Sequence, residues 1–181
     1  MRRIFIDTGA LVALYDSHDQ YAPKAQDVAK TLSKSKVVLV TSNFVVDEAL
    51  TLILKRAGYK RALKFGQALL EKERIKVVNI DENLQQEAWE VFKEYNKDKN
   101  WSFTDCTSFV VMKGLGIEEV FTFDRNFKAA PLGSSILSNE LVSTHTGSSV
   151  PGAGTPYLFH PHLIRKSSIH SLISFTVSSE S

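Results

Sequence analysis

Short apolar segments alternate with amphipathic segments along the first 131 residues, and this alternation narrows the possible folds more than any other feature. Residues 37–41 form a continuous apolar run, as in a strand that is covered on both faces. Strands are predicted over residues 3–7, 37–41, 75–80 and 120–123, and helices over residues 9–15, 22–32, 43–57, 60–72, 82–96 and 102–115. Since strands that alternate with helices are joined by right-handed crossovers, the pattern predicts an α/β fold with a mainly parallel sheet.

The composition of the chain changes near Pro131. Charged residues are frequent before this point. The charged residues after it are only Glu140, Arg165, Lys166 and Glu180. Because this last stretch is rich in Ser, Thr, Gly and Pro, we expect one domain over residues 1–142, with a last strand within residues 136–142. Residues 143–181 are predicted to be a tail, which is either disordered or an extension foreign to the domain.

The overall composition disfavours several classes of protein. The formal net charge is only +2, so contact with nucleic acid must come from a local basic patch. The single cysteine, Cys106, can form neither an internal disulfide nor a zinc site alone, which favours a reducing cytoplasm. No apolar run reaches the about 18 residues that suggest a membrane span, and the apolar start is too short for a signal peptide. A cytoplasmic protein without a membrane anchor is expected.

Four acidic residues fall at matching places in the predicted pattern. Asp7 ends the first strand, and Asp124 follows the strand over residues 120–123. Glu48 and Asp105 lie early in two of the predicted helices. In a parallel sheet, the carboxyl ends of strands and the starts of the following helices meet at one edge, where open α/β folds bind ligands. We therefore expect the four carboxylates to lie close together.

The electrostatics of such a group indicate a divalent cation. Asp105 lies at the start of a largely apolar helix, whose dipole favours a carboxylate by roughly 0.3–1 kcal/mol. Other carboxylates nearby would raise its pKa unless a cation neutralised them. Oxygen ligands suit Mg²⁺ or Mn²⁺, and such a cation can activate water for phosphodiester hydrolysis. In the competing interpretation, each acid is a helix cap or a solvated surface group.

Four segments resemble the PIN domain, and specifically the VapC-type toxins of toxin–antitoxin pairs. The segments are Ile-Phe-Ile-Asp-Thr-Gly-Ala-Leu-Val-Ala-Leu at 4–14, Thr-Ser-Asn-Phe-Val-Val-Asp-Glu at 41–48, Ser-Phe-Thr-Asp-Cys-Thr-Ser-Phe at 102–109 and Val-Phe-Thr-Phe-Asp-Arg-Asn-Phe at 120–127. Each motif alone is weak, but their order and spacing together are specific. The resemblance implies a three-layer α/β/α sandwich around a mainly parallel sheet.

The same resemblance implies a function and a set of site residues. It implies an Mg²⁺- or Mn²⁺-dependent endoribonuclease that acts on RNA, forms a homodimer and binds a small antitoxin protein. It assigns catalysis and metal binding to Asp7, Glu48, Asp105 and Asp124. Periodicity does not separate Glu48 from its neighbour Asp47, and only the match to the family makes that choice. Thr8 and Ser102 match hydroxyl positions beside the metal site of the family, although helix capping is an equal alternative for both.

A basic cluster flanks the helix that carries Glu48. Its candidate RNA-binding residues are Lys55, Arg56, Lys60 and Arg61. The cluster could contact RNA phosphates, bind an acidic partner, or simply form a solvated helical face.

Other functions stay open at this point. A housekeeping RNA-processing nuclease of the same fold is the nearest alternative. A non-catalytic module that binds RNA or protein is disfavoured, because all four acids are present. A phosphatase or phosphotransferase would use Asp7 as its nucleophile. This last alternative is disfavoured because Thr8 and Gly9 follow Asp7, so that the usual Asp-x-Asp signature is absent.

Overall fold

The structure is a computed structural model, and it describes residues 2–70, 75–129 and 135–137. The chain divides into two units, Met1–Val142 and Ser143–Ser181, and every described residue belongs to the first unit. The predicted tail over residues 143–181 therefore lies outside the described residues. So does most of the strand predicted within residues 136–142.

The described region contains the following elements. The strands are β1 (Arg2–Ile6), β2 (Val37–Ser42), β3 (Ile75–Val78), β4 (Glu119–Phe121) and β5 (Ser135–Ile136). The helices are α1 (Thr8–Tyr15), α2 (Ala22–Ser33), α3 (Asn43–Ala57), α4 (Tyr59–Leu70), α5 (Glu82–Tyr95), α6 (Phe103–Leu115) and α7 (Asn126–Ala129). The predicted alternation of strands and helices is confirmed.

The strands form one sheet in the order β3-β2-β1-β4-β5, and every pairing is parallel. In the centre, Phe5 of β1 pairs with Val40 of β2 on one side and with Val120 of β4 on the other. The chain adds strands toward one edge through β2 and β3, and then toward the other edge through β4 and β5. The strand order thus reverses between β1 and β4, and their carboxyl ends are where an open α/β sheet binds its ligand.

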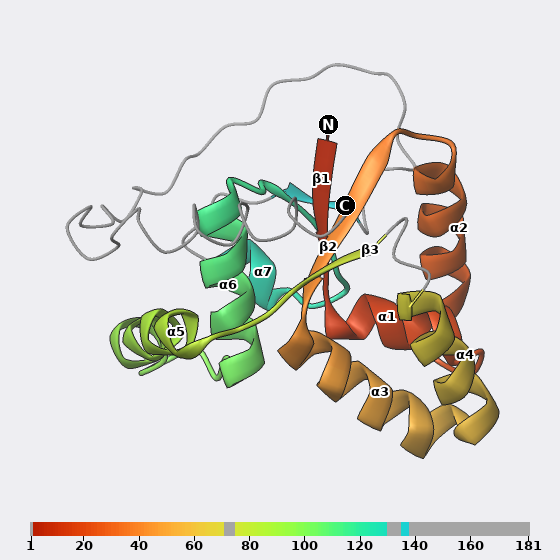
Figure 1. The fold of residues 1–181 in the computed structure, drawn as a ribbon, viewed down its shortest axis with the longest axis horizontal. Helices are drawn as coiled ribbons and strands as arrows, with labels where there is room; N and C mark the ends of the chain where they lie inside the picture. Colours follow the sequence, from red (N-terminus) through yellow and green to blue (C-terminus); the bar gives the residue numbers. More distant parts are fainter. Residues whose placement is uncertain (1, 71–74, 130–134, 138–181) are drawn as a thin grey trace, which may run out of the picture. The chain divides into compact units, whose positions relative to one another are not determined.

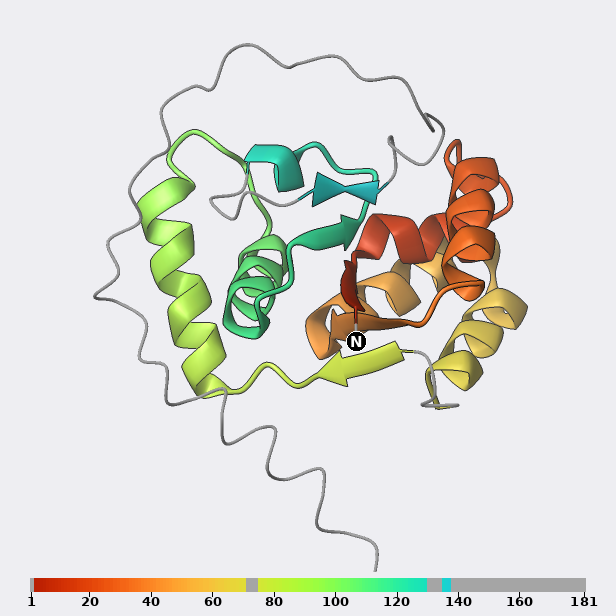
Figure 2. The same ribbon diagram turned by 90° about the horizontal axis from the view of Figure 1, so that it is seen from above.

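Helices cover both faces of the sheet, which confirms the three-layer α/β/α arrangement (Figure 1). Figure 2 shows α5 and α6 on one side of the strands and α1, α2 and α4 on the other. The start of α3 lies at the carboxyl end of β2, and this helix contacts α1 and α4 as well as α6. Side chains of α3 can therefore face the start of α6 across the carboxyl edge of the sheet.

Burial explains the apolar residues of β1 and α6. Ile4, Phe5 and Ile6 are fully buried, as expected for the central strand of a parallel sheet. In α6, every residue from Cys106 to Met112 is buried, so this part of the helix is enclosed on all sides. Burial raises the pKa of the Cys106 thiol to about 12, so Cys106 stays neutral and serves in packing.

The structure also corrects several details of the prediction. β4 ends at Phe121 rather than at residue 123, and it is followed by the short helix α7, which the sequence pattern did not indicate. The N-cap of α1 is Asp7, which accepts a hydrogen bond from the Gly9 backbone, and not Thr8 as proposed. The last strand begins at Ser135, one residue before the predicted range. Among the helices in the described part of the chain, none is long and apolar enough to cross a membrane.

Candidate active site

A cavity of about 570 Å³ opens at the carboxyl edge of the sheet, where β1 and β4 end. All the acids that the sequence singled out line it, and so do both candidate hydroxyl residues. These residues are Asp7, Glu48, Asp105, Asp124, Thr8 and Ser102. Side chains from the end of β1, from α3, from the start of α6 and from the turn after β4 therefore meet in one place. We call this space the carboxylate cavity.

Asp7 is the most deeply placed acid of the cavity, with 5% of its surface exposed. Its Oδ2 accepts a hydrogen bond of 2.9 Å from the Thr122 hydroxyl and one of 3.4 Å from the Gly9 backbone. Burial raises the pKa of the Asp7 carboxyl to about 7, against the lowering effect of the Thr122 hydroxyl, and the negative charge of Asp105 raises it further. Ionisation of Asp7 therefore costs free energy in the folded protein, and a nearby positive charge would reduce that cost.

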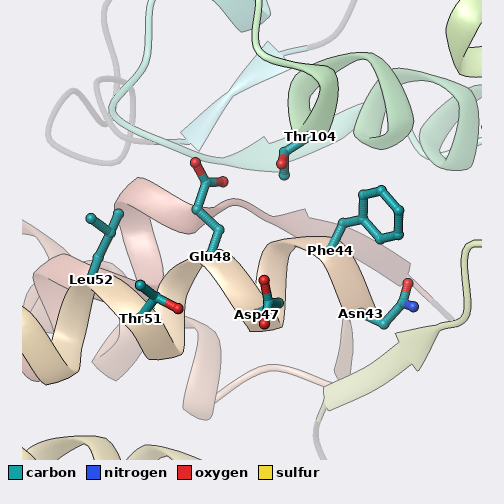
Figure 3. A pocket seen from close by; sticks show the side chains of 7 residues that line it. All are labelled: Asn43, Phe44, Asp47, Glu48, Thr51, Leu52 and Thr104. Atoms are coloured by element: carbon teal, nitrogen blue, oxygen red, sulfur yellow. The ribbon is translucent and has the colours of Figure 1, made fainter.

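Glu48 is fixed by a hydrogen bond to another residue that lines the cavity. The hydroxyl of Thr8 donates to Glu48 Oε2 at 2.8 Å. In Figure 3, Glu48 extends from α3 toward the chain around Thr104, whereas Asp47 leaves the helix in a different direction. Asp47 does not line the carboxylate cavity. The structure thus separates the two neighbouring acids, which the periodicity of the sequence could not do.

Asp105 is held by the start of its own helix. The Ser102 hydroxyl accepts a hydrogen bond from the Asp105 backbone at 3.0 Å, and Asp105 Oδ2 accepts one from the Ser102 backbone at 2.8 Å. This reciprocal pair is a capping box, so Ser102 has the helix-capping role that was predicted as an alternative for it. Burial raises the pKa of the Asp105 carboxyl, and the charges of Asp124 and Glu48 raise it as well, against the lowering effect of Ser102. Ser102 therefore fixes the carboxylate that the other acids repel.

Asp124 is fixed by the turn that leads into α7. Its Oδ1 accepts a hydrogen bond from the Asn126 backbone at 2.8 Å, and its Oδ2 accepts one from the Asn126 side chain at 3.2 Å. The backbone of Asp124 donates to the Thr122 hydroxyl at 3.0 Å, and the same hydroxyl donates to Asp7. Thr122 thus connects two acids of the cavity, a role that the sequence reasoning missed. Its only signal was a hydroxyl in an apolar run two residues before an acid.

The chemistry of these donors fits a divalent cation. Carboxylate oxygens are the ligands that Mg²⁺ and Mn²⁺ prefer, and the mutual repulsion of Asp7, Asp105 and their neighbours favours a bound positive charge. Among the residues that the structure describes, no group of three or more His, Cys, Asp or Glu side chains is placed to hold a metal ion directly. Mg²⁺ commonly uses one or two carboxylates and completes its coordination with water and substrate phosphate. The arrangement fits a cation held in that way.

The outer wall of the carboxylate cavity has a different character. The rings of Tyr21 and Phe123 stack with a centroid distance of 4.6 Å and an interplanar angle of 3°, and Tyr21 is 37% exposed. Arg56 also lines this wall, and its guanidinium lies 3.9 Å from the Asp19 carboxylate. Aromatic rings and a guanidinium are groups that contact bases and phosphates of single-stranded nucleic acid.

The structure distinguishes the members of the predicted basic cluster. Within the described residues, Arg56 is the one that lines the carboxylate cavity. Arg61 lines a separate cavity beside Tyr15 and Pro23. Lys55 and Lys60 are exposed and line neither of these two cavities. The four residues therefore do not line one common cavity among the two named here, and their binding to RNA stays a prediction.

Residues 4–132 match the model of the PIN domain family, and the chain belongs to this family. It is similar to the protein named 23S rRNA-specific endonuclease VapC20 of Mycobacterium tuberculosis, with 34% identity over 128 residues that cover 70% of this chain and 93% of the relative. It is also similar to the VapC ribonuclease of Archaeoglobus fulgidus, with 28% identity over 131 residues that cover 71% of this chain and 81% of the relative.

A solved structure supports the same relationship. The crystal structure of Mycobacterium tuberculosis VapC20, described as a sarcin–ricin loop cleaving toxin, superposes with a TM-score of 0.64 and 31% identity. The superposition covers 70% of this chain and 94% of that one. The predicted resemblance to VapC-like PIN ribonucleases is therefore confirmed, and the predicted class of activity, an RNA-hydrolysing enzyme, is the class that these relatives' names give.

Proposed function

We propose that this chain is an endoribonuclease that depends on Mg²⁺ or Mn²⁺ and hydrolyses RNA phosphodiesters at the carboxylate cavity. The observation that carries the proposal is the meeting of four carboxylates at the point where the strand order reverses. The charge of Asp105 raises the pKa of Asp7, and the charge of Asp124 in turn raises the pKa of Asp105. A group of acids that destabilise one another in this way gains from a bound cation.

In this proposal, Asp7, Glu48, Asp105 and Asp124 would hold the cation together, one or two of them directly and the others through its water ligands. A bound divalent cation supplies positive charge to the phosphate and makes a water molecule more acidic. Without the cation, burial raises the pKa of the Asp7 carboxyl to about 7, so a bound cation would favour the ionised form of Asp7. Three hydroxyls keep the acids in place: Thr8 orients Glu48, Thr122 holds Asp7, and Ser102 holds Asp105.

The RNA chain must enter a cavity that is rich in negative charge. Arg56 is the described basic residue that lines the cavity, and we assign it the contact with a phosphate next to the one that is cut. Lys55, Lys60 and Arg61 add positive charge farther out on α3 and α4, where they would attract RNA without fixing its position. In this proposal, Arg56 is the member of the predicted basic cluster that contacts RNA inside the cavity.

We extend the proposal to the biological role of the relatives, namely the toxin of a toxin–antitoxin pair in the cytoplasm. The name of the Mycobacterium tuberculosis relative makes 23S rRNA the first substrate to test. A small antitoxin is the expected protein partner, and a homodimer is the expected assembly. Large apolar side chains exposed on the α3–α4 hairpin favour a protein partner. These side chains are Leu50, Leu54, Tyr59 and Leu63.

The test is cleavage of total RNA and of isolated 23S rRNA by the purified protein, with the cut ends mapped. Cleavage is expected with Mg²⁺ or Mn²⁺ and is expected to stop when the cation is chelated. The variant Asp105→Asn is expected to be inactive. The matched control Asp27→Asn removes an exposed carboxylate on α2, away from the cavity, and keeps full activity. Undiminished cleavage by Asp105→Asn, or in the presence of a chelator, would refute the proposal.

A further inference from the structure

A second cavity adjoins the carboxylate cavity and has no assigned role. Its volume is about 510 Å³, within the range of small-molecule sites. Glu48 and Leu52 line both cavities, so the two spaces are neighbours along α3. The remaining lining residues are Asn43, Phe44, Asp47, Thr51 and Thr104. Figure 3 shows these side chains on α3 and at the start of α6.

The lining of this second cavity comes mainly from one stripe of α3. Phe44, Asp47, Glu48 and Thr51 follow the spacing i, i+3, i+4, i+7, so they share one face of the helix. The core face of the same helix is a different stripe, formed by Val45, Ala49 and Ile53. The stripe at the cavity is therefore not needed for the core.

Of the two acids that line this cavity, Glu48 is bonded to Thr8, whereas Asp47 is left for a ligand. Within the described residues, it makes no hydrogen bond or ion pair, and its side chain is exposed. Asn43, in contrast, donates to Asn79 at 3.1 Å and accepts from the Ile80 backbone at 2.8 Å. An ionised carboxylate is an acceptor only, so a ligand of Asp47 must present donors.

Phe44 gives the same cavity an aromatic wall. Its ring lies 6.3 Å from the ring of Phe103, at an angle of 56°. The second ring supports the first, and Phe44 is only partly buried. Partly exposed aromatic rings are the usual stacking surface for unpaired bases of RNA.

We infer that the second cavity binds a guanine base of the RNA, next to the phosphate that is cut. Guanine is the base whose Watson–Crick edge presents two neighbouring donors, N1–H and the N2 amino group, and both oxygens of Asp47 can accept from them. Adenine and cytosine present one amino donor beside an acceptor, and uracil presents one donor between two acceptors. The inference rests on the proposed function. Because Glu48 lines both cavities, a base in the second cavity would lie next to the phosphate that is cut in the first.

The test begins with a randomised pool of short single-stranded RNA, cut by the full-length protein with Mg²⁺ and sequenced at the cut ends. Guanine is expected to be enriched at one position that flanks the cut. In Asp47→Asn, which replaces one acceptor by a donor, this preference falls about tenfold. Phe44→Leu lowers cleavage of the guanine-containing sequences by about tenfold through the loss of stacking. Asp27→Asn, with the same change of charge at an exposed site, keeps the preference. A preference that is absent, or unchanged in Asp47→Asn, would overturn the inference while cleavage itself still supports the proposed function.

A binding experiment separates the two proposals if no RNA is cut. GMP, AMP, CMP and UMP are titrated into the protein and followed by NMR. Tighter binding of GMP that is lost in Asp47→Asn supports the base site even if the protein is not a nuclease. Equal binding of the four nucleotides by both proteins overturns it. The mass of the assembly in solution is measured for each variant, and a change of mass in Phe44→Leu with an unchanged base preference would instead place this face between copies of the chain.

Discussion

The inner and outer walls of the carboxylate cavity are built in opposite ways. On the inner wall, Asp7 is almost fully buried and is held by Thr122, and Asp105 is held by a capping box. On the outer wall, Arg56 is half exposed, and among the described residues its ion pair is with Asp19, at a distance of 3.9 Å. Under the proposed function, the inner wall would fix charge for the cleavage step, whereas the outer wall would stay adjustable for a substrate that must enter and leave.

The largest expected effect belongs to the inner wall. Asp7→Asn removes the central carboxylate and should lower RNA cleavage about 10³-fold, because charge stabilisation at a metal site is worth several kcal/mol and each ~1.4 kcal/mol is a factor of ten. Initial rates on a defined RNA at saturating Mg²⁺ measure this. The melting temperature without metal should not fall, since the variant has no buried acid to ionise. A melting temperature that falls together with activity would make Asp7 a structural residue instead.

The next effect concerns the stability of the metal-free protein as a function of pH. The pKa of Asp7 is raised from 3.8 to about 7 in the folded state, so the folded protein binds this proton more tightly than the unfolded chain. The resulting stabilisation is complete below about pH 4 and is lost as the pH rises through about 7, with an upper bound of about 4 kcal/mol.

Denaturant unfolding in the presence of a chelator, at pH 5 and at pH 8, measures this stabilisation. The protein should be less stable at pH 8 than at pH 5. Asp7→Asn should show a smaller difference between the two pH values, and added Mg²⁺ should restore stability mainly at pH 8. The same difference in Asp7→Asn as in the unchanged protein would assign it to other groups.

A smaller effect is expected at Thr122, which connects Asp7 with the Asp124 turn. Thr122→Val keeps the shape of the side chain but removes both hydrogen bonds, at a cost of about 1–3 kcal/mol for buried groups that lose their partners. Cleavage should fall about tenfold. The pH at which stability is lost should rise, because the pKa of Asp7 rises further without the Thr122 hydroxyl. Thr122→Ser retains the hydroxyl and should recover most of both properties. If Thr122→Ser and Thr122→Val behave alike, the hydroxyl has no such role.

The smallest effect is expected on the outer wall. Arg56→Gln should weaken RNA binding about fivefold, or about 1 kcal/mol. The slope of binding affinity against salt concentration should become shallower by the amount that about one phosphate contact contributes. The matched control is Lys55→Gln, one residue earlier on the same helix but outside the cavity. Binding to a non-cleaved RNA is measured at several salt concentrations. Equal losses in the two variants would mean that general attraction, and not the wall of the cavity, explains the effect of Arg56.

The sequence predicted the parts of the site that depend on topology. Asp7 follows a strand, and Asp105 begins an apolar helix, so their meeting at one edge could be predicted from the alternation of strands and helices. The choice of Glu48 over Asp47 could not, because both lie next to apolar residues and only the direction of the side chain separates them.

Other parts of the site could not be predicted because they depend on contacts between distant segments. Thr122 reaches Asp7 because β4 lies beside β1 and ends at Phe121, and a pattern of apolar residues does not contain this register. The place of Arg56 at the cavity depends on how α3 passes the loop that carries Asp19. Of four basic residues of equal appearance in the sequence, Arg56 is thus the one that lines the carboxylate cavity.

The pairing of β1 with β4 has a consequence for how this chain can change in length. Ile6 lies opposite Phe121, and at the other end of these strands Arg2 forms an ion pair with Glu119. One residue inserted within β1 would exchange the two sides of the strand and turn Asp7 away from its neighbours. Insertions into the connection over residues 34–36, at the amino ends of the strands, would leave that alignment intact. Affinity tags, fluorescent labels and natural insertions therefore belong at the amino-terminal margin of the sheet.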